Sequence, residues 1–448
     1  MKKFIESFVN VWKIEELKNR ILITLGFLLV YRFGAQIPLP GIDGSKLANL
    51  SNQTEKGIGW LIDVFTGGSF SKASIFALGI MPYISASIVV QLMGIAIPYL
   101  QKLQKEGESG RKKMNQITRW LTIGITLLQG PGYIYNLYRT LPADAFLLGF
   151  NSFEFLFSSV IILTTGTVFA MWLGEKITDK GIGNGISLLI LVGIVARMPQ
   201  AFIQEFGSVM KGGNGGLMLI TLEIIVWLLI IVACILMVMA VRKIPVQYAR
   251  RSVSGDLEQD LMGGNRQFIP LKLNASGVMP IIFAQAIMFI PAAVAGLSKS
   301  EVAQSISTRF QNIFGWEYNL LFALLIVIFT YFYTAITVPT NKMADDLKRS
   351  GGFIPGVKPG VETADFLDHV MSLITFPGSL FLALLAVFPA IVVSVMGVQS
   401  QWALFFGGTS LLILVGVAID TVQQINSYLL NKHYDGLMKT GKNRKAVA

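Results

Sequence analysis

The chain contains 448 residues, of which 53% are hydrophobic and only 14% are charged. Its mean hydropathy is +0.60. Soluble globular proteins carry about 25% charged residues, so this composition excludes a soluble globular protein, and the same figures exclude a disordered chain. The single cysteine, Cys234, excludes a disulfide-linked scaffold. The composition therefore predicts an integral membrane protein. Its net charge of +11 at pH 7 needs an explanation, because bilayers disfavour charge.

Stretches that lack Asp, Glu, Lys and Arg recur along the chain, and most are long enough to cross about 30 Å of hydrocarbon as a helix. They cover residues 73–101, 120–138, 155–174, 181–196, 224–241, 273–298, 318–341 and 369–419. The last stretch can hold two spans with a turn near 397–401. A further apolar stretch, 21–42, is interrupted only by Arg32, which is close enough to one end to reach the interface. The sequence thus predicts an all-α, polytopic membrane protein with ten transmembrane helices.

Basic residues are distributed unevenly between the two sides of this predicted bundle. One side, formed by both termini and alternate loops, holds 28 of the 37 Lys and Arg residues and 17 of the 26 Asp and Glu residues. That side therefore carries a net charge of +11, and the other side is neutral. Because cytoplasmic loops carry the excess of Lys and Arg, we expect both termini to be cytoplasmic.

Ten spans divide into two halves of five at the glycine-rich loop 212–216. Because five is odd, the second half must insert upside down relative to the first, which is the arrangement of an inverted repeat. Before the first span, Phe4, Phe8 and Trp12 share one face of a predicted amphipathic helix. The expected parts of the chain are a surface helix at 1–20, an N-terminal half at 21–211, a C-terminal half at 212–427 and a cytoplasmic tail at 428–448.

A short apolar segment at 57–71 lies between the first two spans. It is interrupted by Asp63, is bounded by glycines and is too short to cross the hydrocarbon. One interpretation is an interfacial loop on the outer face. The other is a re-entrant segment folded into a protein cavity, where non-helical backbone is tolerated.

The sequence lacks the usual signs of catalysis and of bound cofactors. The only histidines, His369 and His433, are far apart, and one cysteine provides no spacing for a metal site. The glycine-rich segment 181–185 follows no strand, and no Walker lysine follows a glycine loop. We therefore expect a protein that is not an enzyme, with no catalytic residue, metal or cofactor. The predicted spans also carry charge only near their ends, which disfavours an inverted-repeat secondary transporter without excluding it.

Two pairs of isoleucines recur at helical spacing. Ile80 and Ile84 lie four residues apart in the second predicted span, and Ile186 and Ile190 repeat this spacing in the fifth. Such pairs are ordinarily packing or lipid-facing residues. The alternative is a hydrophobic constriction that seals a pore against water and ions, and the residues alone favour the first interpretation.

Several longer motifs resemble the SecY family, the channel subunits of the bacterial Sec protein translocase. The motifs are 37–42 (IPLPGI), 76–88 (FALGIMPYISASI), 106–112 (EGESGRK), 172–187 (WLGEKITDKGIGNGIS) and 406–412 (FGGTSLL). The similarity extends in order from Trp12 to the last span. The resemblance implies a passive channel that carries unfolded preproteins across the bacterial cytoplasmic (inner) membrane and releases transmembrane segments laterally into it.

The resemblance also implies roles for particular residues. A ring of six isoleucines would close the pore, two from the second helix, two from the fifth and one each from the seventh and tenth: Ile80, Ile84, Ile186, Ile190, Ile282 and Ile413. A re-entrant plug helix at about 59–71 would block the outer funnel, with Trp60, Leu61, Ile62, Asp63, Val64, Phe65, Thr66, Gly67 and Gly68. An aliphatic ring can surround an extended chain without binding any side chain strongly, which agrees with the uncharged interior of the spans.

Two polar residues stand beside the expected lateral opening of such a channel. Gln91 follows Ile84 by seven residues, and Asn274 precedes Ile282 by eight. At about 1.5 Å per residue, each lies roughly 10–12 Å on the cytoplasmic side of the ring. We predict that Gln91 and Asn274 face each other or share a water, although each can instead bond its own helix or line the vestibule.

The loops at 242–272 and 340–372 carry ten basic and eight acidic residues. The resemblance implies that they bind the ribosome or the SecA ATPase through Arg250, Arg251, Lys348, Arg349 and Lys358. Lys358 replaces the family's usual arginine and so loses bidentate geometry. The other implied partners are the SecE and SecG subunits, signal peptides, nascent preproteins and membrane lipids, and no DNA.

Overall fold

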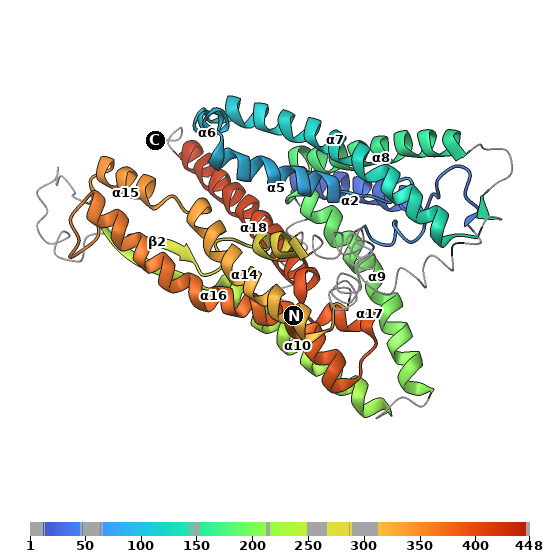
Figure 1. Ribbon diagram of the computed structural model, residues 1–448. Coiled ribbons are helices and arrows are strands. Elements are labelled where there is room, and N and C mark those ends of the chain that lie inside the picture. Colours follow the sequence, from blue (N-terminus) through green and yellow to red (C-terminus); the bar gives the residue numbers. More distant parts are fainter. Residues whose placement is uncertain are drawn as a thin grey trace, which may run out of the picture. The chain divides into compact units, whose positions relative to one another are not determined.

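The structure is a computed structural model (Figure 1) that describes residues 12, 14–44, 47, 63, 66–142, 145–146, 152–211, 216–248, 267–285, 287–288 and 312–444. The chain forms two compact units, one of residues 1–204 and 417–448 and the other of residues 205–416. The helices α9 and α18 each cross from one unit to the other.

The first unit is built around a bundle of helices. Its elements are α2 (Glu15–Gly34), α5 (Met81–Ala96), α6 (Pro98–Lys105), α7 (Glu108–Thr140), α8 (Ser152–Lys180), most of α9 (Gly185–Met210) and the later part of α18 (Gly408–Arg444). The helices α2, α5 and α7 pack with α8, and α5 also packs with α7 (Figure 1). A bend of 102° separates α5 from α6. Ile97 is extended at this bend, because the residue before a proline disfavours the helical region.

The second unit combines long helices with a small sheet. Its elements are α10 (Gly216–Met239), β1 (Val241–Tyr248), β2 (Gln267–Lys272), α14 (Trp316–Thr337), α15 (Thr340–Arg349), β3 (Gly352–Phe353), α16 (Val361–Met396), α17 (Ser400–Ala403) and η3 (Leu404–Phe406). The helix α14 packs along α16, and α15 packs against its beginning. Gly397, with a φ of 67°, ends α16 in the left-handed region that glycine accepts.

The sheet is antiparallel, in the order β2-β1-β3, and is absent from the all-α fold that the sequence predicts. Ile244 pairs with Ile269 in the hairpin, and Gln247 pairs with Phe353. One face is buried in a small core that the sheet shares with α15 and α16: Ile244, Val246, Leu271, Leu347, Ile354, Leu367 and Met371. The regions 242–272 and 340–372, expected as loops, therefore meet in one folded element.

The expected membrane-spanning helices are largely present. In the described part of the chain, six helices are long and apolar enough to cross a membrane: α8, α9, α10, α14 with α15, α16 and α18. The bent pair α5 and α6 makes a possible seventh. The helix α7 contains the predicted span 120–138, whereas α2 covers only 21–34 of the predicted span 21–42, and each also includes charged residues beyond the apolar stretch. Only part of the stretch 273–298 is described. The predicted all-α membrane fold is confirmed, with the small sheet as an addition.

The ends of the chain differ from the expected parts in detail. The helix α2 begins at Glu15, inside the range 1–20 assigned to a surface helix. Phe4 and Phe8 of that helix lie outside the described residues. At the other end, α18 continues without a break from the last predicted span through the tail region to Arg444.

Candidate functional site

A tight turn at 66–72 precedes α5 and is organised by one carboxylate. Asp63 is 1% exposed. Its Oδ1 accepts a hydrogen bond from the Ser71 N–H at 2.7 Å, and its backbone oxygen accepts one from the Gly68 N–H at 2.8 Å. Gly67 and Gly68 have φ values of 66° and 88°, which lie in the left-handed region. The turn therefore depends on a buried acid at one end and two glycines in its middle.

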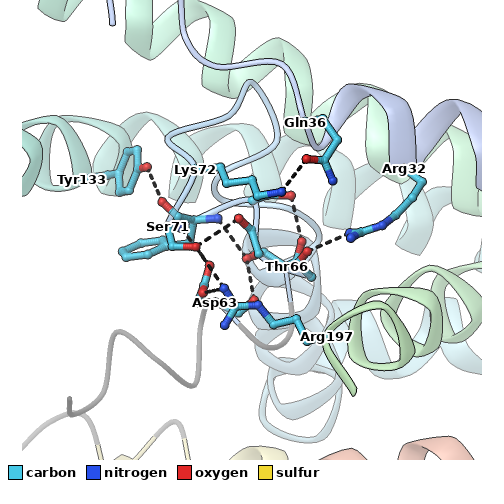
Figure 2. Close-up of polar contacts among 12 residues, drawn as sticks. Arg32, Gln36, Asp63, Thr66, Ser71, Lys72, Tyr133 and Arg197 are labelled. Carbon is cyan, nitrogen blue, oxygen red and sulfur yellow. Dashed lines mark hydrogen bonds and ion pairs between the residues drawn. The ribbon is translucent and has the colours of Figure 1, made fainter. Parts of the chain in front are cut away.

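The charge of Asp63 is balanced by an arginine from α9. Arg197 forms an ion pair with the Asp63 carboxylate, and its Nη2 donates to the Ser71 Oγ at 3.0 Å (Figure 2). Its guanidinium group also lies over Gly68, where an added Cβ would be 3.2 Å from Nε. A buried charge is tolerated when it is paired and hydrogen-bonded, and this pair meets both conditions.

A second arginine, from α2, contacts the backbone of the same turn. The Arg32 Nη1 donates to the Gly67 carbonyl oxygen at 2.7 Å, and nearby the Lys72 Nζ donates to the Gln36 side chain (Figure 2). Burial, followed by the positive charges of Arg32 and Arg197, lowers the pKa of Lys72. Arg32 and Arg197 thus contact the turn from two helices, and the turn itself carries a third cation, Lys72.

The turn is also fixed from α7. The Tyr133 hydroxyl donates to the Phe70 carbonyl oxygen at 2.9 Å, and the two rings lie 4.8 Å apart (Figure 2). Both residues belong to the buried core of this unit. Helices α2, α7 and α9 therefore each contribute a polar contact to one short turn.

The turn contacts α9 and the segment that leads into α5, where the isoleucine pairs of the first unit begin or lie. An added Cβ on Gly67 would lie 2.6 Å from the Cα of Gly193, three residues beyond Ile190 in α9. An added Cβ on Gly79 would lie 3.0 Å from Thr66, and Gly79 directly precedes Ile80. The turn therefore contacts Gly193, three residues after Ile190, and Gly79, one residue before Ile80.

The individual ring candidates have different environments. Ile80 and Ile190 are buried, Ile84 and Ile186 are half-buried, and an added Cβ on Gly174 of α8 would lie 2.9 Å from Ile186. In the second unit, Ile413 of α18 is buried and Ile282 is half-buried. Of the first four, Ile80 and Ile190 lie near residues that contact the turn, and the closure of a six-membered ring stays a prediction.

The other predicted site residues are placed singly. The Gln91 Nε2 donates to the Ser87 Oγ one turn earlier, and the Ser276 Oγ donates to the Asn274 Oδ1. Gln91 and Asn274 belong to different units, and their pairing stays a prediction. Lys348 and Arg349 are exposed at the end of α15, and the exposed Lys358 forms an ion pair with Glu362 at 3.4 Å. The remaining candidates lie outside the described residues: Trp60, Leu61, Ile62, Val64, Phe65, Arg250 and Arg251.

Sequence reasoning missed the role of Arg197. The predicted span 181–196 ended where charge began, so Arg197 was expected near a span end, whereas α9 continues to Met210. The helix tolerates Arg197 because Asp63 compensates its charge. The sequence does contain a signal: Asp63 is isolated in an apolar segment, and single arginines interrupt other apolar stretches. Charged side chains in such surroundings need partners of opposite charge.

Comparison with known proteins identifies the family. The SecY family model matches residues 74–422. Proteins named protein translocase subunit SecY from Streptomyces scabiei and Corynebacterium glutamicum are 38% and 39% identical to this chain. Each alignment covers 97% of this chain, with 99% of the Streptomyces protein and 100% of the Corynebacterium protein.

Solved structures have the same fold at lower identity. A protein-conducting channel has a TM-score of 0.57 at 17% identity, covering 92% of both chains. A SecY structure described for its plug domain has a TM-score of 0.58 at 17% identity, also covering 92% of both chains. Sec61 in a canine ribosome-channel complex has a TM-score of 0.53 at 15% identity, with the same coverage. The chain belongs to the SecY family.

Proposed function

We propose that this chain is the pore-forming subunit of a protein translocase, a passive channel for unfolded polypeptides. The observation that carries this function is the 38–39% identity to SecY subunits along almost the whole chain. The position of the 66–72 turn beside Ile80 and Ile190 supports it, because a constriction and an obstacle above it are what a closed polypeptide channel needs.

The proposed seal is a ring of the six isoleucines Ile80, Ile84, Ile186, Ile190, Ile282 and Ile413. A hydrophobic constriction excludes water and ions by dewetting when it is narrow. Branched aliphatic side chains can pack around an extended polypeptide without strong donors or acceptors that would retain particular residues. The segment at 59–71 would act as the plug above this ring. One of the related structures is described as showing that the SecY plug domain stabilises the closed state and maintains a membrane seal.

Lateral release of hydrophobic segments requires an opening between helices of the two halves. We place Gln91 and Asn274 at this opening, where a hydrogen bond between them or through a water would favour the closed state.

The energy for transport would come from outside the chain, from the SecA ATPase or from the ribosome. Related Sec61 and Ssh1 complexes are described in ribosome-bound states. The proposed docking residues are the exposed Lys348, Arg349 and Lys358 of this chain, together with Arg250 and Arg251. The proposed assembly includes SecE and SecG in the bacterial inner membrane, with both termini of this chain in the cytoplasm.

Transport by the purified complex tests this function. The complex is reconstituted into vesicles with a radiolabelled presecretory protein, and protected full-length product is measured with and without SecA and ATP. We expect protection only when SecA and ATP are both present. Accumulation of a small solute on an ion gradient, without any protected preprotein, would show that the chain is a transporter instead.

A further inference from the structure

One face of α9 carries both the proposed seal and the contacts to the turn. A helix turns by about 100° per residue, so Ile186, Ile190 and Arg197 point within about 40° of one another. Gly193 lies on the same face, between Ile190 and Arg197. Arg197 is therefore about 10 Å along the helix from Ile190, at about 1.5 Å per residue. This alignment places the two proposed ring residues, the residue that contacts the turn and Arg197 along one line on the same helix.

Two positions on this face contact the turn. The lack of a side chain on Gly67 lets the turn approach the α9 backbone, since an added Cβ on Gly67 would lie only 2.6 Å from the Gly193 Cα. Next along the face, the Arg197 guanidinium group reaches Asp63 and Ser71. Because Asp63 is buried, its carboxylate loses its charge partner if α9 moves away while the turn stays. Such a loss is costly for a buried ion pair.

We propose that Arg197 is a positioning residue that couples the plug to the ring, so that an outward shift of the α9 face releases the Asp63 segment. This proposal rests on the proposed channel function. The closed state is then favoured by the ion pair only while Ile186 and Ile190 are in their sealing position. A movement of α9 would then open the ring and release the turn at the same time.

Arg32 has a different part in this arrangement. It binds the Gly67 carbonyl from α2, through a hydrogen bond of 2.7 Å to the backbone rather than an ion pair. The turn is therefore held from two helices, and only the contact from α9 changes with the ring face. Loss of the Arg32 contact weakens the closed state independently of Arg197.

The test is the resting ion conductance of the full translocase complex in planar bilayers, without preprotein or motor. Asp63→Asn and Arg197→Gln each remove one partner of the ion pair, and the double variant removes both. We expect each single variant to raise the resting conductance by about tenfold or more, because one buried charge is left unpaired. The double variant should leak no more than the more leaky single variant, whereas Arg32→Gln combined with Arg197→Gln should leak more than either.

Matched variants separate the proposal from general damage. Arg119→Gln removes one partner of the exposed Arg119–Glu175 ion pair between α7 and α8, and it should leave the conductance unchanged. Arg197→Lys keeps the charge with fewer donors, and its conductance should lie between those of wild type and Arg197→Gln. If Arg197→Gln fails to assemble, a conductance of Arg197→Lys above that of wild type supports the proposal. Wild-type conductance in both Asp63→Asn and Arg197→Lys, or a double variant whose increases multiply, would overturn the coupling. Motor-driven transport by the wild-type complex tests the channel function separately.

Discussion

Gly67 and Gly193 approach so closely that an added Cβ on Gly67 would lie 2.6 Å from the Gly193 Cα. The two residues are 126 positions apart in the sequence and come from the turn before α5 and from the middle of α9. Gly67 also has a φ of 66°, a backbone conformation that residues with a side chain rarely adopt. A side chain at position 67 is therefore disfavoured both by the backbone conformation and by the lack of space.

Gly67→Ala should destabilise this turn through both restrictions. The matched control is Gly107→Ala, because Gly107 has a similar φ of 72° but no neighbouring atom within 4 Å of an added Cβ. We expect Gly67→Ala to reduce stability by at least about 1 kcal/mol more than the control, which is the lower range for overpacking. Thermal unfolding of the purified complex in detergent measures the difference. Equal shifts for the two variants would show that the close approach of Gly193 has no energetic consequence.

Tyr133→Phe should weaken the attachment of the turn to α7. The variant keeps the ring beside Phe70 but removes the hydrogen bond of 2.9 Å to its carbonyl oxygen. The Phe70 oxygen still accepts a hydrogen bond from the Ala73 N–H at 3.3 Å, so the loss of one bond should cost about 0.5–1.5 kcal/mol, measured as a lower unfolding midpoint. Tyr135→Phe, on the same helix at a residue that is 64% exposed, is the control and should have no effect. A midpoint equal to that of the control would contradict the bond.

Thr24→Val should destabilise the glycine-rich segment 181–185 that leads into α9. The Thr24 Oγ1 accepts a hydrogen bond of 3.0 Å from the Ile182 N–H and donates to the Arg20 carbonyl oxygen. Valine has nearly the same shape without the hydroxyl, so the Ile182 N–H loses its acceptor. The expected loss of stability is about 1–3 kcal/mol for this buried amide.

The control for this prediction is Thr165→Val on α8. Thr165 is exposed, and its hydroxyl donates only within its own helix, to the Ile161 carbonyl oxygen at 2.9 Å. Its replacement should change the unfolding midpoint little. Limited proteolysis near 181–185 provides a second measurement, in which only Thr24→Val should be cleaved faster.

Gln91→Leu should lower the hydrophobicity that a marginal segment needs for lateral release. Loss of a polar contact across the opening would destabilise the closed state by about 0.5–1.5 kcal/mol. A series of model segments with increasing leucine content, scored for membrane insertion, measures the threshold. Asn274→Leu should shift it similarly, and the double variant should add nothing further. An unchanged threshold in Gln91→Leu would show that Gln91 and Asn274 do not act as a pair.

The sequence was most informative where a pattern is local. Uncharged stretches predicted most of the helices now described, because a helix in lipid must satisfy its backbone internally and exclude charge. The same rule placed the boundary of the fifth span at Arg197, which was wrong, because a charge that has a partner can lie inside a helix. Likewise, the strands β1 and β3 lie more than a hundred residues apart in the chain, and no local pattern shows that they pair.

The composition and the charge-free stretches by themselves determined that this chain is a multi-span membrane protein, because charge is costly to place in hydrocarbon. The sequence motifs indicated the SecY family. Only the tertiary structure decided that Asp63 meets Arg197, that Gly67 contacts Gly193 and that Tyr133 holds Phe70. Such contacts depend on how distant segments pack in space, and that packing is set by the sum of many weak interactions rather than by any residue pattern along the chain.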